Sequence, residues 1–143
     1  MGGLVARRYI QIFGGDSVDK LVLIAAPNKG IEGSAKNLCH VIGEKRECED
    51  MYSDSVFIKK MNDPNYKPKN VKFYTISGKG CKTNDEDGDG VVTFESSTLD
   101  YAAQFVINGV CDDAFKRNLH SDLVDIDKYP EVYGYIKEIL EGP

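Results

Sequence analysis

Long apolar runs are absent from this sequence, and so is any basic cluster large enough to suggest a nucleic-acid surface. No run approaches the roughly 20 apolar residues that a membrane-spanning helix needs. The net charge of −5 argues against nucleic acid as a partner, because phosphate binding requires clustered Lys and Arg. With 41% apolar and 29% charged residues among 143, the composition is that of one soluble globular domain.

The cysteines lack the C-x-x-C spacing of zinc ribbons and of thioredoxin-like redox sites. Two disulfides would suit an exported protein, or an intracellular one from a hyperthermophile, and buried reduced thiols are the alternative. The even count slightly favours a secreted protein. The N-terminus has no basic segment before an apolar core, so we expect any signal segment to lie upstream of Met1. The four cysteines are Cys39, Cys48, Cys81 and Cys111.

Apolar periodicity predicts an alternation of helices and strands. Apolar residues between positions 4 and 13 have helical spacing, and the following glycine pair ends that helix. A second helix is predicted over about 129–140. Continuous or β-branched apolar segments predict three strands, at 21–26, 71–77 and 102–107. This order predicts an α/β fold, with a parallel sheet and helical crossovers.

The segments between these elements are less regular. Residues 28–69 have no clean period, and two short helices are predicted there, at 35–43 and 48–61. An acidic, glycine-rich loop is predicted from Lys79 to Gly90, a short helix or turn at 97–101, and a further loop over 108–121.

Three motifs, in this chain order, resemble α/β-hydrolases of the lipase and esterase group. The run from Met1 to Arg7 is similar to the residues that follow the nucleophile in the family's G-x-S-x-G elbow. The strand at 21–26 runs into a Pro-x-x-Gly turn, and Asp-Gly-Val-Val at Asp89 and His-Ser-Asp-Leu at His120 complete the set. The resemblance implies a partial α/β-hydrolase fold. Residues 1–143 would be its C-terminal portion, with a cap or lid insertion at about 28–69.

The resemblance implies that Asp89 is the acid and His120 the base of a Ser–His–Asp triad. The serine would immediately precede Met1, outside this sequence, so we expect the chain alone to be inactive. The main-chain N–H of Met1 would be one donor of the oxyanion hole. A solvated loop histidine is the alternative interpretation of His120. We expect His40 to have an ordinary surface or packing role.

The implied activity is that of a serine ester hydrolase, acting on carboxylic or lipid esters through an acyl-enzyme and without a cofactor. An acyltransferase or thioesterase with the same triad is one alternative, and a non-catalytic calcium- or protein-binding module is another. Asp85, Asp87 and Asp89 match the first half of an EF-hand loop. Its twelfth position is Ser96 rather than Glu, and the predicted flanks are strands. A solvated acidic loop is therefore expected for Asp85 and Asp87, with weak calcium binding as the alternative.

Neighbouring parallel strands would bring the loops after the second and third predicted strands together. A Cys81–Cys111 bridge would then brace the loops that carry Asp89 and His120, and Cys39–Cys48 would staple the cap, although spacing alone allows three pairings. The strand at 21–26 would lack one neighbour of the complete fold. Its open edge invites either a partner carrying the upstream half or a homo-oligomer.

Overall fold

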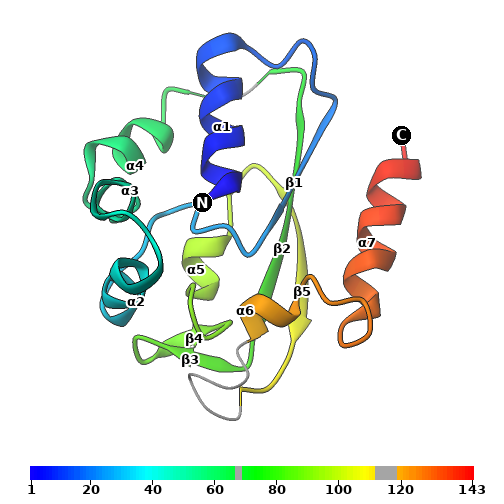
Figure 1. Ribbon diagram of the computed structural model, residues 1–143. Coiled ribbons are helices and arrows are strands. Elements are labelled where there is room, and N and C mark those ends of the chain that lie inside the picture. Colours follow the sequence, from blue (N-terminus) through cyan, green and yellow to red (C-terminus); the bar gives the residue numbers. More distant parts are fainter. Residues whose placement is uncertain (67–68, 112–118) are drawn as a thin grey trace.

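A three-stranded parallel sheet lies at the centre of the computed structural model, which describes residues 1–66, 69–111 and 119–143 (Figure 1). Its strands, in spatial order, are β1 (Lys20–Ile24), β2 (Lys72–Lys79) and β5 (Ala103–Asn108). Leu23 of β1 pairs with Thr75 of β2, which pairs in turn with Gln104 of β5. Each strand lies within two residues of its predicted bounds, and the predicted α/β class with parallel strands is confirmed.

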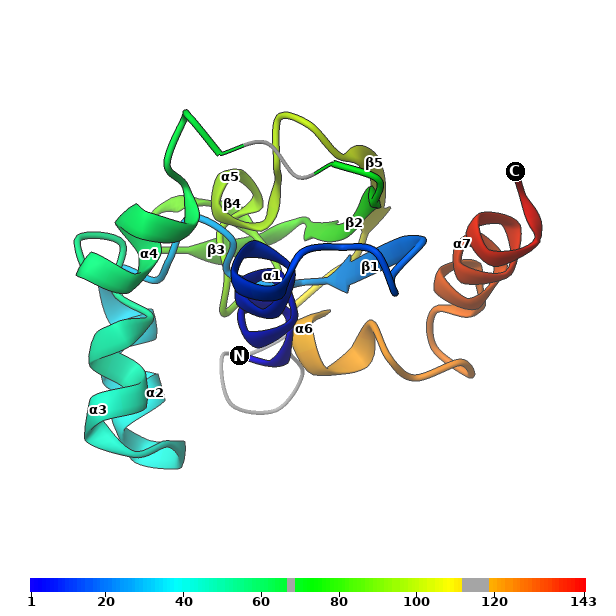
Figure 2. The ribbon, with the colours of Figure 1, turned by 90° about the horizontal axis from the view of Figure 1, so that it is seen from above.

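Helices cover both faces of this sheet (Figure 2). On one face, α1 (Gly2–Phe13) packs through Ile10 against Leu23 and Phe73. On the other, α6 (Leu119–Asp122) and α7 (Pro130–Glu141) cover a second apolar cluster. The buried members of this cluster are Ala25, Ile76, Cys81, Ile107, Leu119, Leu123 and Val132. None of the described helices is long and apolar enough to cross a membrane.

β1 forms one edge of the sheet, because β2 is its only strand neighbour within the described residues. The outer side of α1 carries apolar side chains that are largely in solvent: Val5, Tyr9 and Phe13 are 61%, 50% and 72% exposed. Residues at this spacing lie on one side of a helix. The described surface therefore has an open strand edge and an apolar helix face.

The segment 28–69 contains three short helices, α2 (Ser34–Ile42), α3 (Lys45–Asp50) and α4 (Val56–Met61). The range 48–61, in which one short helix is predicted, contains α4 and the end of α3, with a break between them. Ser55 ends this break: its hydroxyl oxygen accepts a hydrogen bond from the N–H of Ile58 at 3.1 Å and so caps α4. Such a capping residue has an extended backbone, which a continuous helix cannot contain.

A loop is predicted for the acidic segment from Lys79 to Gly90. The structure instead has a small hairpin within this segment. Its strands are β3 (Cys81–Thr83) and β4 (Glu86–Gly88), which pair antiparallel. Asn84 and Asp85 form the two-residue turn, with φ of 54° and 65°. Two successive positive φ values define the turn that matches the twist of a hairpin, and Asn and Asp tolerate this conformation.

Two short helices differ from the predictions. α5 (Phe94–Ser97) begins three residues before the predicted 97–101, because the hydroxyl of Thr93 accepts from the N–H of Ser96 at 3.2 Å and caps it there. α6 carries His120, where a loop was predicted. Residues 112–118 of that predicted loop lie outside the described residues.

Arg7 is a buried cation that joins α1 to both ends of the segment 28–69. Its guanidinium donates to the main-chain oxygen of Asn28 at 2.9 Å and to the side-chain oxygen of Asn62 at 2.8 Å. Burial lowers the pKa of Arg7, and the nearby Tyr101 hydroxyl partly opposes this shift. Asn62 also donates to the main-chain oxygen of Asn28, at 2.9 Å. These bonds hold Asn28 and Asn62 of the segment against α1.

Candidate active site

Asp89 and His120 are in direct contact. Oδ2 of Asp89 lies 2.8 Å from Nδ1 of His120, and the main-chain N–H of His120 donates to the main-chain oxygen of Asp89 at 3.0 Å. Asp89 follows the hairpin and His120 lies on α6, so the contact joins residues 31 positions apart. The structure therefore brings together the two side chains that the resemblance singled out.

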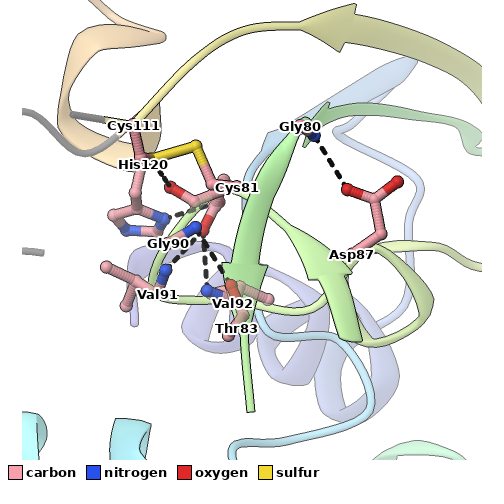
Figure 3. The surroundings of a disulfide bond; sticks show 10 residues. Gly80, Cys81, Thr83, Asp87, Gly90, Val91, Val92, Cys111 and His120 are labelled. Atoms are coloured by element: carbon pink, nitrogen blue, oxygen red, sulfur yellow. Dashed lines mark hydrogen bonds and ion pairs between the residues drawn. A yellow bond between two sulfur atoms is a disulfide. The ribbon is translucent and has the colours of Figure 1, made fainter. Parts of the chain in front are cut away.

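The Asp89 carboxylate is held in one orientation by main-chain donors. Its Oδ1 accepts hydrogen bonds from the N–H groups of Val91 and Val92, at 2.9 and 2.7 Å, leaving Oδ2 for the imidazole (Figure 3). Gly90, with a φ of 92°, lets the chain turn back toward the carboxylate. Asp89 is only 1% exposed, so these main-chain donors and the imidazole take the place of water around its carboxylate.

The His120 imidazole is the exposed member of the pair. Its side chain retains 33% of its accessible surface, whereas that of Asp89 retains 1%. A carboxylate on Nδ1 assigns the proton to that nitrogen, so Nε2 is the nitrogen that carries the lone pair. This arrangement is suited to accept a proton at Nε2 while Asp89 stabilises the resulting imidazolium.

His120 lines a cavity of about 370 Å³ at the carboxyl end of β1. In open α/β sheets, ligands bind beyond the carboxyl ends of the strands. The cavity lies between the N-terminus of α1, the turn after β1, and helices α2 and α3. Its lining consists of Met1, Gly2, Gly3, Ile24, Ala25, Ala26, Pro27, Ile31, Ala35, Cys39, Gly43, Glu47, Met51, Val91, Val92 and His120.

Replacing Gly78 with alanine is expected to disturb the pair. A Cβ at this position would lie 2.8 Å from Cβ of Asp89 and 2.8 Å from Cδ2 of Leu119, the residue before His120. We expect the free energy of unfolding to fall by about 1–3 kcal/mol and the His120 imidazole resonances to shift. Urea unfolding and NMR measure the two effects.

Gly134→Ala on α7 is the matched control, because a Cβ there meets no atom within 4 Å. Alanine in a helix is expected to leave stability unchanged or to raise it by up to about 1 kcal/mol. Equal stability of Gly78→Ala and the parent would contradict the tight contact between Gly78 and Asp89.

The four cysteines form two disulfides, Cys39–Cys48 and Cys81–Cys111, with Cα–Cα distances of 5.7 and 5.4 Å. The second lies beside His120 (Figure 3). Cys81 also forms an isolated backbone bridge with Asp89. The Cys81–Cys111 disulfide thus joins the loop after β5 to β3, the strand next to Asp89. Both bonds are consistent with an oxidising, extracellular environment.

Met1 and His40 lie in different surroundings. Met1 lines the cavity together with His120, and its main-chain oxygen accepts from the N–H of Leu4 at 2.8 Å in the first turn of α1. Burial lowers the pKa of its α-amino group. His40 is exposed on α2, where its Nε2 lies 2.6 Å from the hydroxyl of Tyr52, and it does not line the cavity.

Asp85 and Asp87 lie on the exposed hairpin rather than between two helices. Asp85 is in the turn, and Oδ1 of Asp87 accepts from the N–H of Gly80 at 2.8 Å (Figure 3). Among the residues that the structure describes, no group of three or more His, Cys, Asp or Glu side chains could hold a metal ion.

Residues that support Asp89 were missed in the sequence. The hydroxyl of Thr83 accepts from the N–H of Gly90 at 3.0 Å, and Gly78 makes room for Asp89. An Asp followed by Gly is a turn signal in which the side chain accepts from the main-chain N–H two residues further on, so the contact with Val91 could have been anticipated. Nothing local in the sequence indicates Thr83.

The topology and the placement of this pair define a partial α/β-hydrolase-like fold. No family model matches the sequence, and no curated protein matches it. Among solved structures, the mature form of a lipase from Bacillus licheniformis is similar, with a TM-score of 0.62 and 16% sequence identity. The match covers 92% of this chain and 62% of the lipase chain, so the protein spans less than two thirds of that length. At this identity the likeness shows the fold.

Proposed function

We propose that the protein is part of a serine ester hydrolase in which Asp89 orients His120 and His120 is the general base. The observation that carries this proposal is the buried, hydrogen-bonded Asp89 against Nδ1 of an imidazole that lines a cavity. This is the acid–base half of a catalytic triad. The shared fold with a lipase supports the same reaction class.

The nucleophile, we infer, is a serine immediately before Met1. The first residues of α1 line the same cavity as His120, and a strand-to-helix turn at this point would present the serine hydroxyl. Its oxygen attacks the ester carbonyl while Nε2 of His120 takes its proton. The imidazolium then protonates the departing alcohol, and a water repeats the sequence to release the acid. The main-chain N–H of Met1 would donate to the oxyanion.

The proposed substrates are carboxylic or lipid esters with an apolar acyl chain. The cavity wall opposite the sheet comes from α2 and α3, and its side chains are mostly apolar. We propose the segment 28–69 as the cap of the site. Arg7 and the bond between Asn62 and Asn28 support this role, because they anchor the first residue of the segment and the residue after α4 to α1.

We propose that a further strand, from an upstream part of the same domain, pairs with the open edge of β1. The alternative is that a second copy of the chain covers this edge in a homo-oligomer. An unpaired edge exposes main-chain donors and acceptors, and the exposed side chains of Val5, Tyr9 and Phe13 add apolar surface. The lipase chain is longer than the part that this protein matches. Both disulfides support secretion.

The coding frame upstream of Met1 tests the proposal. We expect it to encode Gly-x-Ser directly before Met1, and we expect the extended protein to hydrolyse p-nitrophenyl butyrate. A fluorophosphonate probe should label that serine and leave the 143-residue chain unlabelled. A frame without this serine, or a folded extended protein that neither reacts with the probe nor hydrolyses the ester, would overturn the proposal.

A further inference from the structure

One acidic side chain stands out in the otherwise apolar cavity. Glu47 lies on α3, one helical turn before Met51, and both residues line the cavity together with His120. Asp89 is not among the lining residues, and neither is any Lys or Arg. Among the described residues of the lining, Glu47 is therefore the only ionisable group apart from His120 and the Met1 amine.

Within residues 1–66, 69–111 and 119–143, Glu47 and its helical neighbour Glu49 differ in their ion-pair partners. On the same helix, Glu49 forms an ion pair with Lys45, at 3.8 Å. No ion pair of Glu47 is present among the described residues. Glu47 is also exposed, so water reaches its carboxylate. The cavity thus has a fixed negative charge on its cap side.

We propose that Glu47 sets the charge preference of the cavity, so that it accepts apolar ligands with a neutral or cationic group and rejects those with an anionic group. This inference rests on the proposed function. The substrates are then esters that have no carboxylate or phosphate on the part that lies against α3. Specificity is a difference between affinities, and a like charge near a site is an effective way to reject one class of ligand.

The expected size of this preference follows from Coulomb's law. Two unit charges several ångströms apart near a protein surface change an equilibrium by about tenfold. Salt screens charges that are exposed, so the preference should weaken as ionic strength rises. An apolar wall beside the carboxylate strengthens its field within the cavity.

Binding to the 143-residue chain tests the inference without requiring catalysis. The probes are hexyltrimethylammonium, hexanol and hexanoate, which share one alkyl chain and differ in charge, and the readout is the shift of the His120 imidazole resonances. We expect Glu47→Gln to lower the ratio of hexyltrimethylammonium affinity to hexanoate affinity by about tenfold at low salt, and to leave the affinity for hexanol unchanged. The Met1 amine acts on this ratio in the opposite sense, but it is present in both proteins and cancels in the comparison.

Glu49→Gln is the matched control, since Glu49 lies on the same helix but does not line the cavity. It should leave the ratio of affinities unchanged. No binding of any probe, or a ratio of affinities that Glu47→Gln does not alter, would overturn the inference. The hydrolysis and labelling experiment on the extended protein is independent of these outcomes, so failure of the charge preference and failure of the proposed reaction are distinguishable.

Discussion

Replacing His120 with alanine is expected to lower kcat of the extended, ester-hydrolysing protein by about 10⁶-fold, the scale of losing the base of a serine hydrolase triad. The imidazole is the group whose Nε2 would accept the serine proton, and its Nδ1 is held by Asp89 at 2.8 Å. Asp89→Asn should cost about 10⁴-fold, because an amide favours the wrong tautomer of the imidazole. Rates of p-nitrophenyl butyrate hydrolysis measure both effects.

His40→Ala is the matched control for His120→Ala. His40 is exposed, contacts the hydroxyl of Tyr52, and does not line the cavity, so its loss should leave kcat unchanged. A drop of similar size in both variants would point to a general loss of structure. An active His120→Ala protein would remove His120 from the mechanism.

Removing the Cys81–Cys111 bridge is expected to cost more stability than removing Cys39–Cys48. The bridges close segments of 30 and 9 residues, and the entropy of loop closure in the unfolded chain gives about 3.6 and 2.6 kcal/mol. Each pair would be replaced by serine, and the free energies of unfolding compared by urea titration. The larger loss should accompany the bridge beside His120.

The two serine pairs also separate stability from function. Loss of Cys81–Cys111 should reduce the hydrolytic rate of the extended protein even where it is fully folded, because Cys81 forms a backbone bridge with Asp89. Loss of Cys39–Cys48 should act mainly on KM, since Cys39 is part of the cavity wall. Equal stabilities of the two variants, or a rate that neither changes, would contradict this assignment.

The sheet could be predicted because its first strand is a continuous apolar run and the other two strands are rich in β-branched and aromatic residues. β1 and β2 contribute side chains to the apolar clusters on both faces of the sheet, and strands buried on both faces are rich in apolar residues. The final helix could be predicted from its periodic face, of which Val132 and Ile139 are buried. These signals are local, and each depends on the sequence of one element alone.

The features that were missed depend on contacts between distant segments or on backbone turns. The break before α4 is fixed by a single cap at Ser55. The hairpin depends on positive φ at Asn84 and Asp85, for which the composition of an acidic loop gave no periodic signal. Arg7 finds its acceptors at Asn28 and Asn62 only after the chain has folded. No pattern within α1 indicates them.

Asp89 and His120 were anticipated as a pair through the motifs around them, yet neither motif specifies the distance between the side chains. That distance follows from Gly78, which leaves room for Asp89 above β2, and from the main-chain donors of Val91 and Val92. A sequence resemblance can propose the residue types. Packing against the sheet determines whether they meet.

The double attachment of His120 to Asp89 has a mechanical consequence. One hydrogen bond joins the side chains and another joins the main chains, at 2.8 and 3.0 Å. Rotation of the imidazole about its own bonds strains only the first, whereas a slide of α6 lengthens both together. A displacement of α6 would therefore weaken two hydrogen bonds to Asp89 rather than one, so the second bond makes the position of His120 more resistant to such motion.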